Sequence, residues 1–481
     1  MHRSIIFVVL LASCLPLLPA AVRADAPNVV LVMADDQGWG DMAYNGHPHA
    51  RTPNFDALAK EGLRFDRFYA AHPVCSPTRG SVMTGRTPNR YGCFSWGHPI
   101  RPQEITIAEA LKTAGYRTGH FGKWHIGSVQ AASPVSPGNS GFDTWVSAFN
   151  FFDISPLLSV QGKATKYTGD SSDVTGREAI EFIRQCAQKK EKFLAVVWFG
   201  SPHAPHQALA DDRAPYSDLP QPQQHFLGEI TAMDRAVGEI RQELKKQGLS
   251  NNTILWYCSD NGALPKVGST GGRRGAKASI YDGGIAVPGL LEWPAMIKSP
   301  RVTDLPCVTS DIYPTVLEAC GVKVENQPPL DGVSLLPLLK SQMTERPRPI
   351  GFWDSGLPGI GTPSEAWMQD LYEAQQAGEE PNDPKRVLPD AGKIKSPSPL
   401  DKLPGHSAWI DGAWKLHRIV PKKSNEPRYE LYNLAADKRE SMNLIDNEPE
   451  QAAKMKKELE AWLESVVRSL NGDDYAGKAE R

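Results

Sequence analysis

Polar residues follow three short apolar runs of the sequence, at the point where each run ends. They are Asp35-Asp36 after residues 28–34, Ser201-Pro202-His203 after residues 193–199, and Ser259-Asp260-Asn261-Gly262 after residues 253–258. Short apolar runs rich in β-branched residues, with polar or glycine-rich flanks, are typical of strands buried in a parallel sheet. Because ligands of open α/β sheets bind at the carboxyl ends of the strands, we expect these residues to share one rim.

Two of these groups offer only oxygen ligands. Asp35, Asp36, Asp260 and the amide oxygen of Asn261 form a set that suits calcium or magnesium better than zinc. Neighbouring carboxylates that lose hydration repel one another, and a hard cation offsets that cost. Asp-Asp and Asp-Asn-Gly are also ordinary turn sequences. Two such groups, each directly after a buried strand, favour a metal site over two turns.

Cationic and proton-carrying residues lie in three further motifs. Lys123 and His125 are two residues apart in GHFGKWHIG, so in an extended segment they would face the same side. His203 lies in SPHAPH, and Lys277 lies in GGRRGAKASIYDGG. Each alone is more often a solvated or hydrogen-bonded residue. Around a metal, such groups neutralise and orient a sulfuryl or phosphoryl ester and protonate its leaving group.

Cys75 lies in the turn-rich segment HPVCSPTRG, with Pro77 and Arg79 at fixed offsets. It could be a small buried hydrophobic residue, or a thiolate activated by a helix N-terminus and by Arg79. A disulfide framework is not expected, because the six cysteines after Cys14 are scattered and the sequence has no C-x-x-C. A thiolate also suits an all-oxygen hard-cation site poorly.

The sequence resembles the type I, formylglycine-dependent sulfatase family of the alkaline-phosphatase superfamily, and is similar to arylsulfatases and N-acetylgalactosamine-6-sulfatases. CSPTRG fits the signature C-x-P-x-R, with Thr78 where many relatives have serine, and TGR continues it. The other matching motifs, in order, are NVVLVMADDQGWGD, GYRTGHFGKWHIG, SPHAPH, SDNG, GGRRGAKASIYDGGIAVPGLLEWP and the closing ELYNLAADKRESMNL. The resemblance covers essentially the whole chain after residue 24.

The resemblance implies a modified cysteine and one metal ion. Cys75 would be oxidised to Cα-formylglycine by a formylglycine-generating or an anaerobic sulfatase-maturing enzyme. The hydrated aldehyde would supply the oxygen nucleophile that a thiol does not. One Ca²⁺ would be held by Asp35, Asp36, Asp260, Asn261 and the formylglycine at position 75.

The resemblance also implies roles for the remaining residues. Arg79 and Lys123 would stabilise the hydrated aldehyde, and His125 would take a proton from its second hydroxyl so that sulfate is expelled. His203 and Lys277 would bind the sulfate, and one of them would protonate the departing alcohol. The expected substrate is a sulfated saccharide.

Strands that alternate with helical patterns predict an α/β fold with a mostly parallel central sheet flanked by helices, which the resemblance makes alkaline-phosphatase-like. Helices are expected over 53–62, 106–115, 173–190, 224–247, 312–320 and 449–467. We predict a catalytic α/β domain over residues 25–345. A smaller C-terminal α+β subdomain, residues 346–481, would contain antiparallel strands, a terminal helix and, over 355–405, long loops around one short helix.

The N-terminal segment and the composition limit location and partners. Residues 1–24 read as a signal peptide cleaved after Ala24, which predicts a secreted or periplasmic protein. A lipoprotein anchored at Cys14 is the alternative, disfavoured because apolar sequence continues beyond it. A formal net charge of -2 gives no sign of nucleic-acid binding, and no later segment is long and apolar enough for a membrane span.

The sequence therefore predicts a sulfatase that acts on a sulfated carbohydrate or polysaccharide. The alternatives are a phosphonate or phosphate ester hydrolase of the same superfamily, a thiolate hydrolase, and a sulfated-glycan-binding pseudoenzyme. Three loops with Trp, Arg and His residues are candidate sugar subsites: residues 91–102, 128–152 and 355–405.

Overall fold

The computed structural model describes residues 26–379, 381, 383–388, 403–421, 424 and 426–475. The predicted signal peptide and the alternative lipid anchor at Cys14 lie outside the described residues. No helix within the described part of the chain is long and apolar enough to cross a membrane.

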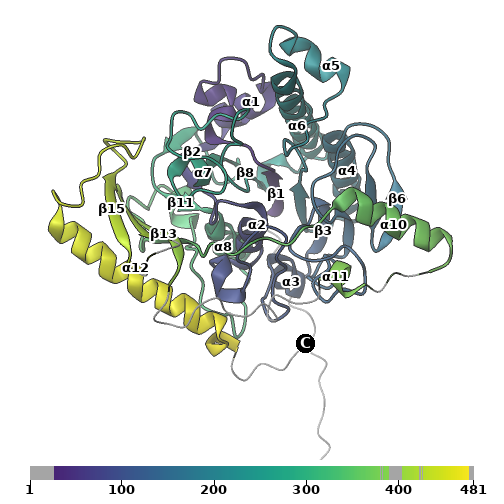
Figure 1. The fold of residues 1–481 in the computed structure, drawn as a ribbon. Helices are drawn as coiled ribbons and strands as arrows, with labels where there is room; N and C mark the ends of the chain where they lie inside the picture. Colours follow the sequence, from purple (N-terminus) through teal and green to yellow (C-terminus); the bar gives the residue numbers. More distant parts are fainter. Residues whose placement is uncertain are drawn as a thin grey trace, which may run out of the picture.

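A large twisted sheet forms the centre of the molecule, with helices on both faces (Figure 1). Its strands lie in the order β10-β2-β9-β8-β1-β7-β3-β4-β5-β6, with β11 beside β2. The central strands β8, β1, β7, β3 and β4 are mutually parallel, and β9, β5 and β6 pair antiparallel toward the edges. Their bounds are β1 Asn28–Ala34, β2 Leu63–Tyr69, β3 Arg117–Lys123, β4 Thr144–Ala148, β5 Leu157–Val160, β6 Lys163–Lys166, β7 Phe193–Trp198, β8 Thr253–Ser259, β9 Ala286–Glu292, β10 Arg301–Thr303 and β11 Cys307–Val308.

The alternation of side chains along β1 feeds two hydrophobic cores. Val29 and Leu31 face one core, shared with the helices α3 and α8, whereas Val30 and Val32 face the other, shared with α4 and α6. Apolar residues on both faces explain why the strand is an uninterrupted apolar run. The helices of this part are α1 Pro53–Glu61, α2 Cys75–Thr84, α3 Ile107–Thr113, α4 Ser171–Lys189, α5 Ala210–Arg213, α6 Gln221–Lys246, α7 Asp282–Ile285, α8 Ile312–Cys320 and α9 Leu336–Leu339.

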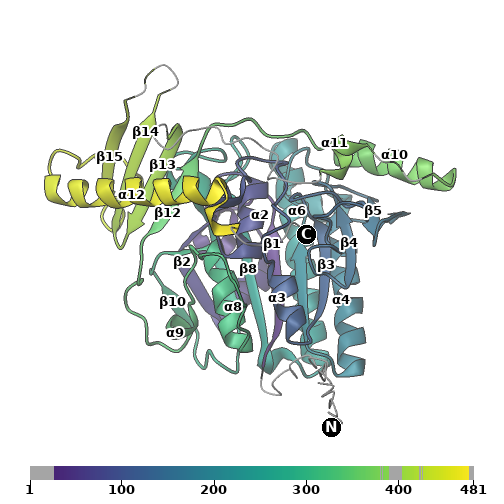
Figure 2. The same cartoon turned by 90° about the horizontal axis from the view of Figure 1, so that it is seen from below.

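A small antiparallel sheet follows, in the order β12-β13-β14-β15. Its strands are β12 Ile350–Asp354, β13 Gly405–Asp411, β14 Trp414–Val420 and β15 Arg428–Asn433. The terminal helix α12, Pro449–Leu470, runs along one face of this sheet (Figure 2). The other face contributes Phe352 and Ile410 to a core with Tyr69 and Ile285, so the small sheet packs against the edge of the large one.

The predicted fold class is confirmed, as are the three predicted strands and the six predicted helices, within a few residues at their ends. The six cysteines after Cys14 are all free and buried. The prediction for residues 355–405 was wrong in part: its described residues contain two helices rather than one, α10, Ser364–Gln376, and α11, Pro384–Val387, while residues 389–402 lie outside the described part. The candidate loop 128–152 likewise contains β4. The predicted domain boundary at residue 345 stays a prediction.

Candidate active site

The three predicted strand ends meet at one rim of the large sheet. The backbone N–H of Asp35 donates to the carbonyl of Ser201 at 2.9 Å, which joins the ends of β1 and β7. The backbone N–H of Asp36 donates to Asp260 Oδ1 at 3.0 Å, and Asn261 Nδ2 donates to Asp36 Oδ1 at 2.9 Å, which joins β1 and β8. Asp36 has a φ of 67°, a left-handed turn directly after the strand. The predicted oxygen ligands are therefore neighbours in space.

A cation from a different element contacts each of the three carboxylates. Lys123 Nζ at the end of β3 donates to Asp35 Oδ2 at 2.6 Å. Arg79 of α2 donates to Asp260 Oδ2 at 2.7 Å. Lys277 donates to Asp36 Oδ2 at 2.6 Å, and its loop is tied down because the backbone N–H of Lys277 donates to the carbonyl of Ala263 at 2.9 Å.

Burial and pairing shift the pKa values of these groups in opposite directions. Burial raises the pKa of Asp35 well above its ordinary value, although Lys123 opposes the shift. For Asp36, burial is outweighed by Lys277 and His203, so its pKa lies below the ordinary value. The carboxylate of Asp36 in turn raises the pKa of Lys277, against the effect of burial. Asp36 and Lys277 therefore form an ion pair, whereas Asp35 lacks full compensation for its charge.

Two oxygens of the predicted metal set are buried without a hydrogen-bond partner: Asp35 Oδ1 and Asn261 Oδ1. An unpaired buried acceptor is costly, and a hard cation satisfies it. Asp36 and Asp260 already accept hydrogen bonds, but a carboxylate has further lone pairs for an ion. Asp35, Asp36 and His203 also place one ligand atom each within 4.8 Å of one another. The residues present therefore fit a hard cation.

Cys75 is the first residue of α2, and its side chain is buried. Burial raises the pKa of its thiol, although Lys123 and Lys277 oppose the shift. The thiol is therefore not poised as a thiolate, which disfavours the thiolate-hydrolase alternative. Its backbone position is fixed by the neighbours: Ser76 Oγ accepts from the backbone N–H of Gly97 at 2.7 Å.

The backbone conformation at His125 differs from the one that the sequence predicted. The strand β3 ends at Lys123, and His125 has a φ of 54°, so the expected extended segment was wrong at this residue. Its Nε2 lies 3.0 Å from Thr362 Oγ1, while Nδ1 is buried without a partner. Burial lowers the pKa of His125, and the neighbouring cations lower it further, so the ring is neutral.

Thr362 and Asn150 are site residues that sequence reasoning missed. Asn150 Nδ2 donates to Thr362 Oγ1 at 3.0 Å, on the same oxygen that contacts His125. Thr362 lies in the segment 355–363, which links the small sheet to α10 (Figure 1). This segment is anchored where the backbone N–H of Ile360 donates to the carbonyl of Trp96 at 2.9 Å. No motif in the sequence marked Thr362, because the contact depends on the path of this segment.

His203 and Lys277 are the partly exposed members of the cluster, each with a side chain 19% exposed. His203 Nε2 is 3.6 Å from Asp36 Oδ2, and its ring stacks on Phe151 with centroids 4.3 Å apart and planes at 13°. Burial lowers the pKa of His203 to about 4, against the pull of Asp36. The imidazole is thus neutral until another anion approaches it.

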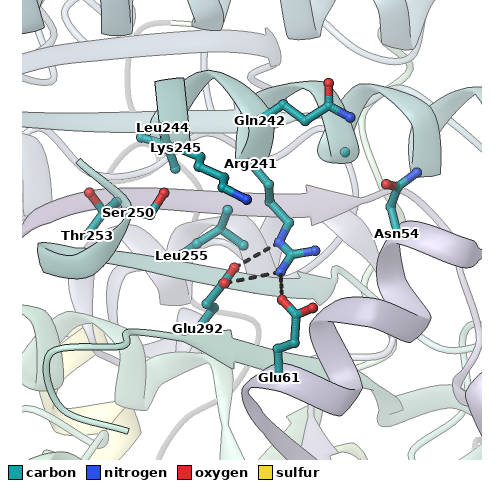
Figure 3. A pocket seen from close by; sticks show the side chains of 11 residues that line it. Asn54, Glu61, Arg241, Gln242, Leu244, Lys245, Ser250, Thr253, Leu255 and Glu292 are labelled. Atoms are coloured by element: carbon teal, nitrogen blue, oxygen red, sulfur yellow. Dashed lines mark hydrogen bonds and ion pairs between the residues drawn. The ribbon is translucent and has the colours of Figure 1, made fainter. Parts of the chain in front are cut away.

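A cavity of about 410 Å³ elsewhere on the molecule has a different character (Figure 3). Arg241 crosses it and is paired with Glu61 at 2.6 Å and Glu292 at 2.8 Å. It includes Thr253, the first residue of β8, so it lies at the opposite end of that strand from Asp260. Its arginine already has two carboxylate partners, and none of the predicted site residues lines it.

The chain is similar to known proteins in both sequence and structure. Residues 27–322 match the family model described as Sulfatase. The chain is 32% identical over 387 residues to the N-acetylgalactosamine-6-sulfatase of Mus musculus, covering 70% of this chain and 71% of that protein. It is 29% identical over 478 residues to the arylsulfatase A of Bos taurus, covering 91% and 87%. The crystal structure of Ps i-CgsB in complex with k-i-k-neocarrahexaose superposes with a TM-score of 0.76 at 26% identity, covering 91% and 93%.

Proposed function

This chain belongs to the sulfatase family, and we propose that it hydrolyses the sulfate esters of a sulfated saccharide by means of a formylglycine at position 75 and a bound Ca²⁺. The family resemblance inferred from the motifs is confirmed, and the chain is a sulfuric ester hydrolase. Two names support a saccharide as the substrate class. One relative is called N-acetylgalactosamine-6-sulfatase, and the similar crystal structure of Ps i-CgsB is a complex with k-i-k-neocarrahexaose.

The observation that carries the proposal is that carboxylates, an amide oxygen and cationic side chains gather around Cys75. Two buried oxygens, Asp35 Oδ1 and Asn261 Oδ1, lack a hydrogen-bond partner, and a cation would satisfy them. Arg79, Lys123 and Lys277 each contact one of the three carboxylates of the site, so a bound divalent cation would add positive charge to it. That charge suits an anionic sulfate ester.

The cation would be held by Asp35, Asp36, Asp260, Asn261 and the oxygen of residue 75, and would polarise a sulfate oxygen and lower the pKa of the attacking hydroxyl. Conversion of Cys75 to formylglycine would supply a hydrated aldehyde with one hydroxyl to attack sulfur and a second to lose a proton.

The side chains of this chain would do the rest. His125 Nδ1, unpartnered and neutral, would accept the proton of the second hydroxyl, with Thr362 Oγ1 fixing the ring through Nε2. Arg79 and Lys123 would hold the modified residue. Lys277 and His203 would hold the sulfate, and the partly exposed His203 would protonate the departing alcohol.

The pairing of Lys277 with Asp36 keeps Lys277 charged, which suits it to hold the sulfate rather than to give up a proton. An arriving sulfate would raise the pKa of His203, because an anion favours the imidazolium. We therefore assign to His203 the role of donating a proton to the departing sugar oxygen.

The protein would be matured by a formylglycine-generating or anaerobic sulfatase-maturing enzyme. Export through residues 1–24, with cleavage after Ala24, would place it in the periplasm or outside the cell, as expected for an enzyme of polysaccharide degradation.

Release of sulfate from defined sulfated saccharides tests the proposal, with matched phosphate and phosphonate esters in parallel. We expect sulfate release to exceed phosphate release, and mass spectrometry of the tryptic peptide Phe68–Arg79 from active enzyme to show an aldehyde in place of the thiol of Cys75. Faster turnover of the phosphate or phosphonate esters would support the phosphohydrolase alternative, and an intact thiol in fully active enzyme would refute the formylglycine.

A further inference from the structure

A cavity of about 880 Å³ opens beside His203, between the hairpin of β5 and β6, the helix α10 and the loop after β7. Figures 1 and 2 both place α10 next to this hairpin, at the side of the large sheet away from the small sheet. Phe151, Phe152 and Tyr167 line it together with polar side chains. A concave, partly aromatic site of this size is typical of ligand pockets, and aromatic rings pack against sugar faces.

Two residues that line the cavity lie next to residues of the candidate active site. Phe151, one of its walls, stacks on the imidazole of His203. Pro363, another of its lining residues, directly follows Thr362, whose hydroxyl contacts His125. If His203 protonates the departing alcohol, the saccharide behind that alcohol extends past Phe151 into this cavity.

The charged residues that line the cavity are two carboxyl groups and one lysine. Asp153 and Glu365 line it. Lys166 is its one cationic lining residue in the described part of the chain, and the ammonium lies over the ring of Tyr372 at 4.4 Å. Burial, followed by the nearby Glu365 and Asp170, raises the pKa of Asp153 to about 7. Glu365 is exposed and Asp153 is half-buried, and neither has an ion-pair partner among the described residues. Two carboxyl groups without a cationic partner are a poor environment for an anion.

We propose that this cavity binds unsulfated sugar residues on the leaving side of the scissile ester, and that Asp153 and Glu365 exclude a second sulfate from the neighbouring residue. The inference rests on the proposed function and specifies its substrate as a saccharide that is sparsely sulfated on that side. Carboxyl groups also pair with sugar hydroxyls, so the same side chains favour a neutral sugar while they repel a sulfate ester.

Three probes test this inference. They are the monosulfated oligosaccharide desulfated fastest in the panel above, the corresponding sulfated monosaccharide, and the same oligosaccharide with one added sulfate on the residue next to the scissile ester. We expect kcat/KM of wild-type enzyme to be at least about 10-fold higher for the monosulfated oligosaccharide than for either of the other two.

Substitutions then assign the discrimination to the two carboxyl groups. In the double variant Asp153→Asn/Glu365→Gln, and to a smaller extent in Glu365→Gln alone, the ratio of kcat/KM between the monosulfated and disulfated oligosaccharides should fall to about 3 or less. Glu181→Gln, on the exposed face of α4 with its side chain 57% exposed, is the matched control and should leave the ratio unchanged. Because both substrates are compared within each variant, a general loss of activity does not affect the ratio.

The outcomes separate this inference from the function on which it rests. Equal kcat/KM for all three probes, or an unchanged ratio in the double variant, would overturn the role of the cavity while sulfatase activity stands. If wild-type enzyme with a verified formylglycine releases no sulfate from any saccharide of the panel, the proposed function fails and this inference falls with it.

Discussion

Two clusters of buried charge lie about the loop that carries Lys277, and they differ in how completely they are satisfied. The first is the active-site rim at the ends of β1, β3 and β8. The second, the junction cluster, lies where the small sheet meets this loop and consists of His406, Lys415 and His417 of the small sheet, Glu440 after it, and Asp282 of α7.

Every member of the junction cluster has a partner. Lys415 Nζ donates to Asp282 Oδ1 at 2.7 Å and to the carbonyl of Ile280 at 2.9 Å, and lies 3.0 Å from Glu440 Oε1. His417 Nε2 lies 2.6 Å from Glu440 Oε1, and its Nδ1 is 2.8 Å from His406 Nε2. Among the described residues that carry a buried polar atom without a partner, none belongs to this cluster.

In the rim, by contrast, Asp35 Oδ1, His125 Nδ1 and Asn261 Oδ1 are buried without a hydrogen-bond partner, and Asp35 Oδ1 has only Arg79 at 3.7 Å. Buried charges that pair with one another hold two parts of a fold in one arrangement. Buried charges without a partner are costly, and they persist where a ligand supplies the missing contact. The comparison therefore distinguishes a cluster in which every member has a partner from one in which buried polar atoms are left without a hydrogen bond.

The largest expected effect is on activity at the rim. Replacing Cys75→Ala should abolish sulfate release, because no nucleophile remains, while the melting temperature changes by only a few degrees. The matched control is Cys186→Ala, a buried cysteine of α4 far from the rim in the fold, which should keep its activity. Retained activity in Cys75→Ala would contradict the mechanism.

The next largest effect is on stability at the junction. Lys415→Met should lower the free energy of unfolding by about 3–5 kcal/mol, because two carboxylates and a carbonyl lose their buried cation. Lys454→Met, which breaks an exposed pair with Asp411 at 2.7 Å, should cost about 1 kcal/mol or less. Urea unfolding of both variants measures the difference. Equal stability of the two would mean that the junction cluster is not a structural anchor.

Calcium should stabilise the rim alone. With free Ca²⁺ at 100 times its dissociation constant, wild-type protein should gain about 2.7 kcal/mol over protein treated with a chelator, because the ion binds the folded state. In Asp35→Asn the gain should shrink, since the orphaned carboxylate oxygen becomes part of a neutral amide. Thermal unfolding with and without Ca²⁺ measures this, and identical melting curves of wild-type protein would argue against the metal site.

The smallest effect concerns Thr362. Thr362→Val should lower kcat by about 2- to 12-fold, the equivalent of one hydrogen bond of about 0.5–1.5 kcal/mol. The pH profile should also change, because His125 loses the partner of Nε2. Thr362→Ser keeps the hydroxyl and should restore both properties. An unchanged pH profile in Thr362→Val would show that the contact merely fills space.

Particular residues show how far the sequence could lead. The helix start at Thr106 was readable from local chemistry, and its capping box is present: Glu109 N donates to Thr106 Oγ1 at 3.1 Å, and Thr106 N donates to Glu109 Oε2 at 2.8 Å. The strand ends at Ala34 and Ser259 were also readable from the local sequence. A carboxylate, Asp35 or Asp260, directly follows each of these residues. The ligand set of the rim followed from the parallel arrangement of these strands.

Contacts between distant segments were not readable in this way. The pairing of each rim carboxylate with a particular cation, such as Asp35 with Lys123, depends on which side-chain atoms the folded strands bring within reach. Thr362 reaches His125 across 237 residues, and Asp153 and Glu365 share one cavity although they lie in different candidate loops. Nothing in the composition of those loops distinguishes their inner residues from their exposed ones.

The sequence by itself determined the elements, the strand-end carboxylates and the motif around Cys75, because hydrophobic period, capping chemistry and motif spacing are properties of short segments. Only the tertiary structure decided which oxygens of the rim lack a hydrogen-bond partner, which hydroxyl contacts His125 and which residues line the cavity beside His203. Those outcomes depend on the packing of segments far apart in the chain, and local residue preferences do not encode the paths of the loops that connect them.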